Sequence, residues 1–422
     1  MNYILLISLV FIFIISIIFS IYLKFPQIKA LFNIKRLFKH SDHHAFLTTL
    51  GTNIGTGNLV GITSGVALGG AGVIFWMWIF AFFGCCLSFA ENAYAVKYQS
   101  VIGGERRGGA SYYILKGLNS KIISVIFAVS LLITNTILFP PVQINAITVC
   151  TANIFNLNKY LVGIILFVVL GMIVFSGTKV IVKAQDTIVP IMSIAFMIVS
   201  SFLIIVNYKE IPLAVTKIIN SALSIKSIGI GMILNTMLTG FKRSLFSNEA
   251  GLGTTPSVTG ISTRNSLDNG YLQVLVVYVD TLIMCTITGL IVVISGLNTD
   301  ILSSSYAIIN LFETYFSKAG SLIGYLFIIV FALSSVIGQF YLGESNIMFL
   351  GIVTKLSPSL LKISYRIIYS VGIIIGIMVS FKSSLELLDV GMVILGILNI
   401  MVIITLEKRE KYLHKLIKGD IM

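Results

Sequence analysis

The chain has 422 residues, of which 57% are hydrophobic and only 11% are charged, and its mean hydropathy is +1.00. This composition excludes a soluble globular domain and indicates an all-α polytopic membrane protein. The net charge of +13 would also suit a nucleic-acid-binding protein, but the cations lie between long apolar segments, as membrane topology requires. We therefore expect the lipid bilayer, and no nucleic acid, as a partner.

The first apolar segment, Ile4–Tyr22, contains 19 consecutive uncharged residues, enough to cross most of a hydrocarbon core about 30 Å thick. No Lys or Arg precedes it and no Ala-x-Ala-like site follows it, so the sequence favours a retained helix over a cleaved signal peptide. Apolar runs and their breaks predict eleven spans in all. Their ranges are 4–22, 43–67, 71–98, 121–149, 160–178, 185–206, 226–260, 270–296, 320–350, 363–381 and 386–406.

Lys and Arg are unevenly divided between the two sides that these spans define. Of the 29 cations, 23 fall on the side that holds residues 23–42 and the C-terminus, and 6 fall on the other side. The positive-inside rule then predicts a cell (inner or plasma) membrane protein with its N-terminus outside and its C-terminus cytoplasmic. Residues 29–40, KALFNIKRLFKH, repeat apolar residues at helical spacing between cations and are expected to lie along the cytoplasmic interface.

Glycine-rich breaks interrupt two of the spans. GTGN at 55–58 interrupts the second span, and SNEAGLG at 247–253 interrupts the seventh, five spans later. Five intervening spans place the two broken helices in opposite orientations, as an inverted-topology repeat requires. The predicted organisation is an N-terminal helix and amphipathic segment (1–42), a first five-helix repeat (43–206), a second, inverted five-helix repeat (226–406) and a cytoplasmic tail (407–422).

A helix break at membrane depth frees backbone groups that must find other partners. The freed N–H groups and the positive helix end suit a carboxylate, while the freed carbonyls suit a desolvated cation such as Na⁺. Glycine lets the backbone approach such ligands, and Asn53 and Asn58 add neutral partners. The alternative is that the glycines serve close helix packing, which remains equally open for Gly61 and Gly65.

Among the ionisable residues inside predicted spans, four carboxylates are singled out as functional candidates, because a charge is costly there: Glu91, Glu249, Asp280 and Glu344. Structural pairs of Glu91 and Glu344 with Lys97, Lys242 or Arg243 are the alternative to an ion or proton role. Asp280 and Glu249 remain open between a structural network and coupling.

The hydroxyl pair Ser334 and Ser335 also lies inside an apolar span. Such serines usually bond back to their own helix, but this pair could complete an oxygen shell for Na⁺ with carbonyls of the first break. The four histidines fall in cytoplasmic segments, and the cysteines fall in apolar runs, so neither predicts a metal cluster or a disulfide framework.

At these positions the chain resembles the alanine or glycine:cation symporter family, the sodium:alanine symporters. The matching stretches occur in the family's order between about residues 45 and 350. They are GTGNLVGI, GGAGVIFWMW, FAENAYAVKY, GGASYYI, PVQINAI, LFSNEAGLGTTP, QVLVVYVDTLIMCT and FALSSVIGQFYLGE. The resemblance implies a leucine-transporter-type fold of the amino acid-polyamine-organocation superfamily, here with one extra N-terminal helix.

The resemblance also implies roles for single residues. The carbonyls of Gly51 and Ile54, with Ser334 and Ser335, would hold Na⁺. The N–H groups of Thr56 and Gly57 would receive the substrate carboxylate. The other substrate-binding positions implied by the resemblance are Asn58, Gln143, Phe246, Asn248 and Gln339. Gln339 departs from the family, which usually has an aromatic residue there, so the departure predicts a changed pocket floor.

The expected function is Na⁺-coupled symport of a small neutral amino acid such as alanine, glycine or serine, without an enzymatic cofactor. An H⁺-coupled transporter, a carrier of serine, threonine or glutamine, and a transport-inactive membrane sensor on the same fold remain alternatives. An enzyme is not expected, since the sequence has no catalytic His in a span, no His-Glu-x-x-His, no Gly-x-Ser-x-Gly and no Walker lysine.

Overall fold

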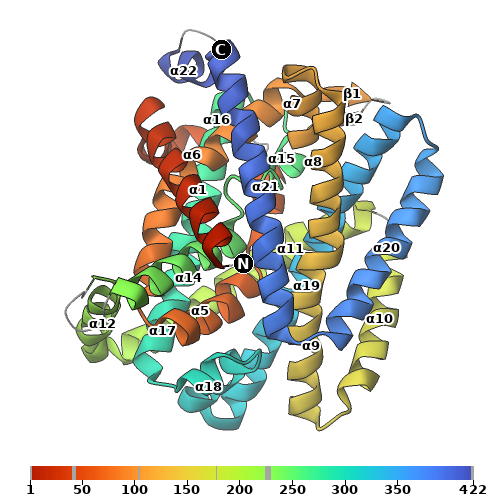
Figure 1. Cartoon of the computed structure of the whole chain (residues 1–422). Helices are drawn as coiled ribbons and strands as arrows, with labels where there is room; N and C mark the ends of the chain where they lie inside the picture. The colour runs from red at the N-terminus through yellow and green to blue at the C-terminus, as the bar shows by residue number, and fades with distance from the viewer. Residues whose placement is uncertain (1, 40–43, 103–104, 177, 224–229, 420–422) are drawn as a thin grey trace.

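The computed structural model describes residues 2–39, 44–102, 105–176, 178–223 and 230–419, which are nearly all helical (Figure 1). The first half contains α1 (Asn2–Tyr22), α2 (Pro26–Phe32), α3 (Ile34–Lys39), α4 (His44–Asn53), η1 (Gly57–Gly61), α5 (Ile62–Gly69), α6 (Val73–Lys97), α7 (Ala110–Gly117), α8 (Lys121–Ile133), η2 (Thr134–Leu138), α9 (Phe139–Phe155), α10 (Lys159–Ser176), α11 (Thr178–Val206), η3 (Tyr208–Glu210) and α12 (Ile211–Leu223). The second half contains α14 (Ile230–Asn248), α15 (Pro256–Thr259), α16 (Ser266–Val277), η4 (Tyr278–Cys285), α17 (Thr286–Ser295), α18 (Thr299–Leu302), α19 (Ala307–Thr354), α20 (Pro358–Met378), α21 (Phe381–Glu410) and α22 (Tyr412–Lys418). Strands β1 (Ser100–Ile102) and β2 (Glu105–Arg107) form an antiparallel hairpin after α6.

Seven helices in the described part of the chain are long and apolar enough to cross a membrane. They are Ile4–Tyr22, Val73–Lys97, Lys121–Phe155, Ser266–Ser295, Ala307–Thr354, Pro358–Met378 and Phe381–Glu410. An eighth is added if Pro190–Val206 and Tyr208–Leu223, which meet at a 75° bend, count as one span. This is the architecture of a polytopic membrane protein. The eleven spans and the 5+5 repeat stay predictions, because several expected spans are broken or shorter helices.

Both predicted breaks are confirmed. Between α4 and η1, Ile54 and Gly55 leave the helical conformation. Between α14 and α15 the chain turns through Glu249, Gly251 and Gly253, which all have positive φ angles of 52°, 83° and 76°. Glycine tolerates this left-handed backbone, whereas it is strained for other residues. The second break is therefore a run of left-handed positions that glycine makes accessible.

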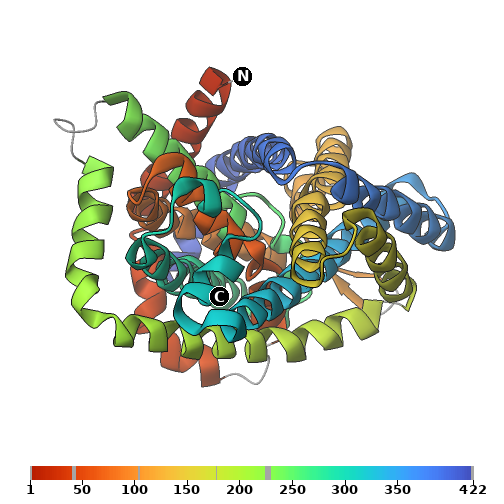
Figure 2. The same cartoon turned by 90° about the horizontal axis from the view of Figure 1, so that it is seen from below.

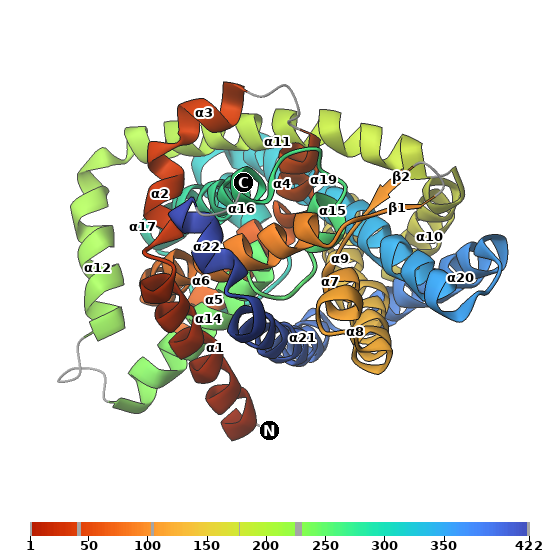
Figure 3. The same ribbon diagram turned by 90° about the horizontal axis from the view of Figure 1, so that it is seen from above.

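The broken helices lie inside a framework of longer ones. α6 packs against α14 and α16, and α19 packs against α4, α9 and α11. Seen from below and from above, α11 runs lengthways along one side of the molecule, and α12 turns away at its end (Figures 2 and 3). α11 packs against α4 and α17, while α12 packs against α6, α14 and α17. The helices named here therefore pack around both helix breaks.

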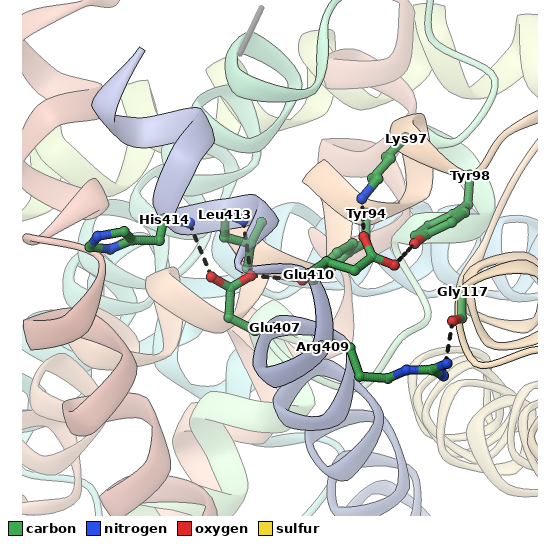
Figure 4. A network of polar contacts seen from close by, with 9 residues as sticks. All are labelled: Tyr94, Lys97, Tyr98, Gly117, Glu407, Arg409, Glu410, Leu413 and His414. Atoms are coloured by element: carbon green, nitrogen blue, oxygen red, sulfur yellow. Dashed lines mark hydrogen bonds and ion pairs between the residues drawn. The ribbon is translucent and has the colours of Figure 1, made fainter. Parts of the chain in front are cut away.

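Glu407 joins several helices on the side of the molecule predicted to be cytoplasmic (Figure 4). Its carboxylate accepts hydrogen bonds from the backbone N–H groups of Leu413 and His414 at 2.9 and 3.1 Å. These groups lie in the first turn of α22, where N–H groups have no helical partner. The same carboxylate accepts hydrogen bonds from the hydroxyls of Tyr22 at 3.1 Å and Tyr94 at 2.8 Å. Glu407 therefore caps α22 and ties it to α1 and α6.

Glu410, one turn further along α21, contacts the end of α6. It pairs with the Lys97 ammonium and accepts a hydrogen bond from the Tyr98 hydroxyl. Burial and the neighbouring Glu410 raise the pKa of Tyr98, which keeps this phenol a donor. The Lys97 ammonium also lies 3.8 Å from the centre of the Tyr412 ring. We call Glu407, Glu410 and these partners the C-terminal polar cluster.

Candidate functional site

The first helix break is closed by neutral groups. The backbone N–H of Gly55 donates to the side-chain oxygen of Asn58 at 2.9 Å, a bond in which a residue three positions on satisfies a freed donor. The Ile54 carbonyl accepts a hydrogen bond from the Ser334 hydroxyl at 3.3 Å, which also donates to Phe331 of its own helix at 2.9 Å. A Cβ on Gly55 would lie 1.7 Å from the Ser335 hydroxyl oxygen, so any larger residue would have to displace that hydroxyl. The structure thus brings Ile54, Ser334 and Ser335 together.

Gly51, the remaining residue of the predicted Na⁺ site, lies in the last turn of α4, three residues before Ile54. Among the residues that the structure describes, no group of three or more His, Cys, Asp or Glu side chains gathers in a metal-binding arrangement. A cation at the first break would therefore be held mostly by carbonyl and hydroxyl oxygens, a ligand set that suits a hard monovalent ion.

The residues predicted to bind substrate lie around the same break. The Thr56 hydroxyl donates to the side-chain carbonyl of Gln143 on α9. A Cβ on Gly57 would lie 3.1 Å from the carbonyl oxygen of Phe246, so the two broken helices touch at this point. The Phe246 ring in turn packs against Gly61 and lies 6.0 Å, centre to centre, from the Phe139 ring. These contacts make one continuous wall from α9 to α14.

Asn58 connects the first break to Asp280 in η4. Its amide nitrogen lies 2.8 Å from a carboxylate oxygen of Asp280, 3.1 Å from the Asp280 carbonyl and 3.2 Å from the Ser247 hydroxyl. The second carboxylate oxygen of Asp280 accepts hydrogen bonds from Ser247 at 2.5 Å and from Thr281 at 2.9 Å. All four side chains are buried. The described residues provide no Lys or Arg partner for Asp280.

Asn248 links the two broken helices rather than facing the Thr56–Gln143 pair. Its side-chain nitrogen donates to the hydroxyls of Ser244 and Thr281, both at 3.0 Å, and its side-chain oxygen accepts from the Ala250 N–H at 3.0 Å. Its backbone carbonyl accepts a hydrogen bond from Asn53 at 3.0 Å. Asn248 therefore connects the two broken helices to each other and to η4.

Gln339 pairs with Glu249. Its side-chain nitrogen lies 2.8 Å from a Glu249 carboxylate oxygen, and both residues are buried. The Gln339 side-chain oxygen has no hydrogen-bond partner among the described residues. The pair joins the second break to α19. An amide at this position thus donates to a buried carboxylate, which a purely hydrocarbon side chain could not do.

The second break is closed by a carboxylate from another helix. Glu91, fully buried on α6, accepts hydrogen bonds from the N–H groups of Gly251 at 3.1 Å and Gly253 at 2.8 Å. The Thr255 hydroxyl, at 3.3 Å, and the Asn399 side chain on α21, at 2.7 Å, donate to it as well. Successive N–H groups of left-handed glycines form a concave anion site, and here the protein fills that site itself. The expected pairing of Glu91 with Lys97, Lys242 or Arg243 is wrong.

Lys242 and Arg243 instead pair with Asp389 of α21. An Arg243 guanidinium nitrogen lies 2.6 Å from Asp389, and the Lys242 ammonium lies 3.5 Å from its other oxygen. Arg243 is buried, and its carbon stem packs against Gly65 while its guanidinium lies 5.7 Å from the centre of the Phe246 ring. These two cations are among the 23 that were counted on the side predicted to be cytoplasmic. They are instead partners of Asp389 inside the molecule. Glu344 has Lys362 at 4.0 Å.

Some residues of these networks were not identified from the sequence. Ser247 and Thr281 each adjoin a predicted residue. Asp389 is a carboxylate inside the last apolar span, so the rule that selected Glu91 would have found it, whereas the neutral Asn399 falls outside that rule. What the sequence does not carry is the pairing itself.

The chain is similar in sequence to several known proteins. The sequence pattern of the sodium:alanine symporter family matches residues 1–417. The amino-acid carrier protein AlsT of Bacillus subtilis is 32% identical over 383 residues, which cover 89% of this chain and 80% of that protein. The probable sodium/glutamine symporter GlnT of the same organism is 32% identical over 402 residues, 92% of this chain and 83% of that protein. The sodium/alanine symporter AgcS of Methanococcus maripaludis is 34% identical over 316 residues, 72% of this chain and 69% of that protein. The chain therefore belongs to the sodium:alanine symporter family, a family of cation-coupled amino acid transporters.

Proposed function

We propose that this protein carries a small neutral amino acid, such as alanine, glycine or serine, into the cell together with Na⁺. One observation carries the proposal: Glu91 already occupies the N–H groups of Gly251 and Gly253 at the second break. The carboxylate of a substrate is then left with the first break, at the N–H groups of Thr56 and Gly57. No Lys or Arg side chain among the described residues bonds to this break, which suits one carboxylate of a zwitterion rather than a diacid.

The coupling ion is assigned to the carbonyl side of the same break. The Ile54 carbonyl, the Ser334 and Ser335 hydroxyls and, one turn earlier, the Gly51 carbonyl supply neutral oxygens for Na⁺. Asp280 and Glu249 are the coupling groups in the alternative, H⁺-driven mechanism, because both are buried carboxylates beside a break.

The pocket is expected to be small. The Phe246 and Phe139 rings and the Thr56–Gln143 pair fill the space next to the first break, with Asn58 beside it. A second substrate class, serine, threonine or glutamine, is favoured by Gln339, whose side-chain oxygen has no hydrogen-bond partner in the described part of the chain. A site that bonds a substrate hydroxyl or amide rejects analogues that leave this bond unmade, because a stranded buried polar group costs about 1 to 3 kcal/mol.

Uptake into proteoliposomes tests the function. We expect saturable accumulation of labelled alanine driven by an inward Na⁺ gradient, with competition by glycine and serine stronger than by leucine or glutamate. Accumulation driven by a proton gradient in the absence of Na⁺ would shift coupling to Asp280 or Glu249. Absence of uptake with any gradient, for any neutral amino acid, would favour the transport-inactive sensor.

A Gln339→Trp variant separates the two substrate classes. If Gln339 selects the substrate, replacing its amide should lower competition by serine, threonine and glutamine relative to alanine. An unchanged order of competitors would remove Gln339 from selectivity and leave it as the partner of Glu249.

The topology is proposed from the cation distribution, with the N-terminus outside and the C-terminus in the cytoplasm. A Cys introduced at Asn2 should react with an impermeant thiol reagent in intact cells, whereas a Cys introduced at Lys418 should not. The opposite labelling pattern would reverse the orientation and the repeat assignment with it.

A further inference from the structure

The short helices α2 and α3 follow directly after α1, which is long and apolar enough to cross the membrane. One face of α2, with Gln27 and Ala30, is buried where the helix packs against α6 and α16. The opposite face exposes three large apolar side chains: Ile28, Leu31 and Phe32. Phe32, 86% exposed, is the most exposed large apolar side chain in the described part of the chain. Seen from above, α3 reaches the outer edge of this end of the molecule (Figure 3).

Cations lie beside this apolar face. Residues 24–39 contain no Asp or Glu but five cations: Lys24, Lys29, Lys35, Arg36 and Lys39. Arg36 pairs with Asp268, whereas no carboxylate among the described residues pairs with the four lysines. Burial, and then the neighbouring Lys24, lower the pKa of Lys29 below its ordinary value. An anion between two cations that repel each other is favourable, because it stabilises the charged form of both.

We propose that α2 and α3 form a binding surface for anionic lipid headgroups. The exposed apolar side chains enter the boundary between headgroups and acyl chains, and the lysines beside them bind the phosphates, as in amphipathic helices that lie in the membrane interface. α22 shows the contrast. It carries the exposed cations Lys415 and Lys418, but none of its described residues is an exposed large apolar side chain. Charge and apolar surface coincide on α2 and α3.

Two contacts fix this surface to the helix that it covers. The Gln27 carbonyl accepts a hydrogen bond from the Tyr278 hydroxyl at 3.0 Å, and the Arg36 guanidinium lies 2.6 Å from the Asp268 carboxylate. Asp268 lies in the first turn of α16, and Tyr278 begins η4, which packs against η1 of the first break. Lipid headgroups that hold α2 and α3 in place therefore restrain α16 and η4 as well.

Hydrogen–deuterium exchange of the full chain in nanodiscs tests the lipid surface without using transport. Nanodiscs of phosphatidylcholine are compared with nanodiscs of equal parts phosphatidylcholine and phosphatidylglycerol. Each lysine near an anionic surface contributes about a fivefold change in affinity. With phosphatidylglycerol the amides of α2 and α3 should thus exchange at least about 25-fold more slowly, the effect of two lysines. The amides of α22 report the general effect of a charged surface and should slow by less than about fivefold.

Three variants separate charge from apolar contact. Lys24→Gln/Lys29→Gln removes two cations and keeps the contacts to α16, so the slowing by phosphatidylglycerol should fall by about 25-fold. Lys415→Gln/Lys418→Gln is the matched control, because it removes the same charge from α22 and should keep the full slowing of α2 and α3. Phe32→Gln removes an apolar anchor but no charge, so it should speed exchange in both kinds of nanodisc. Thermal unfolding in detergent checks that each variant folds.

The effect on α16 is tested by uptake and rests on the proposed function. Na⁺-driven alanine uptake should be faster in vesicles that contain phosphatidylglycerol, and Lys24→Gln/Lys29→Gln should lose that difference. Equal exchange of α2 and α3 in both kinds of nanodisc, or unchanged slowing in the double variant, would overturn the lipid surface. Slowed exchange without a difference in uptake would overturn the restraint of α16. A wild type that takes up no amino acid would overturn the proposed function, while the exchange measurement would still decide on the lipid surface.

Discussion

At the first helix break the freed backbone groups meet neutral partners, whereas at the second they meet a carboxylate. Asn58 and Ser334 close the first break with bonds of 2.9 and 3.3 Å, and Glu91 closes the second with bonds of 3.1 and 2.8 Å to Gly251 and Gly253. Neutral side chains can exchange these bonds for a ligand at modest cost, while uncovering a buried charge is expensive. We therefore expect ligand exchange at the first break and structural support at the second.

Removing the Glu91 charge tests whether the second break depends on a carboxylate. In Glu91→Gln an amide replaces the carboxylate, so at least one of the two glycine N–H groups meets another donor. We expect a loss of about 4 kcal/mol in the free energy of unfolding, from several buried donors left unsatisfied, and no measurable uptake. Chemical denaturation in detergent and proteoliposome uptake measure both effects.

The matched control is Glu386→Gln, the same substitution at an exposed position of α21. It should change neither stability nor uptake. If Glu91→Gln were as stable and active as this control, the second break would not depend on a carboxylate.

The first half of the second broken helix, α14, has its own charged support in Arg243 and Asp389. Arg243→Met should cost about 3 kcal/mol, the lower end for breaking a buried pair, because Lys242 remains 3.5 Å from Asp389. The double variant Arg243→Met/Asp389→Leu should recover part of that loss, since no buried charge is then left unpaired. Lys242→Met, which keeps the Arg243 pair, should cost less than about 1 kcal/mol. Equal losses in all three variants would contradict this order.

A steric change tests the first break. Gly55→Ala places a methyl group 1.7 Å from the Ser335 hydroxyl oxygen, so something must shift, at a cost of about 2 kcal/mol. Gly55→Ala/Ser335→Ala removes that oxygen and should recover most of the thermal stability. Na⁺-dependent uptake should not recover, because the second substitution also removes an ion ligand. Recovery of uptake along with stability would exclude Ser335 from ion binding.

We expect a smaller effect when only the Ser335 hydroxyl is removed from the first break. Ser335→Ala alone should raise the Na⁺ concentration for half-maximal uptake by about fivefold, the loss of about 1 kcal/mol for one oxygen ligand. Ser370→Ala, whose hydroxyl bonds a carbonyl of its own helix at 2.9 Å, should leave it unchanged. Identical Na⁺ dependence in both variants would count against a site at the first break.

The sequence was sufficient to locate both breaks, because glycine clusters inside apolar runs are local signals. It was also sufficient to bring together Thr56 with Gln143 and Ile54 with Ser334, though only through the family resemblance. The pairing of Asn58 with Asp280 could not be predicted in this way, because the two residues are 222 positions apart and no local pattern links them.

Glu91 shows why the remaining partners could not be predicted. For a carboxylate inside a predicted span, one interpretation is a pair with a cation, and the candidates for Glu91 are Lys97, Lys242 and Arg243. Its partners are mainly backbone N–H groups, which every residue except proline carries and which a sequence therefore does not distinguish. Only the left-handed backbone of the second break directs two of those groups toward one point.

The C-terminal polar cluster also bears on how the protein is made. Tyr22 at the end of the first helix bonds to Glu407, which follows it by 385 positions, and its ring stacks on that of His414 at 5.1 Å. A ribosome that adds about 5 to 20 residues per second needs roughly 20 to 80 seconds to cover that interval. For that whole period the first helix waits in the membrane without this partner. The contact between Tyr22 and Glu407 therefore forms only after all the helices between them have been synthesised, and a chain that stops before Glu407 lacks it.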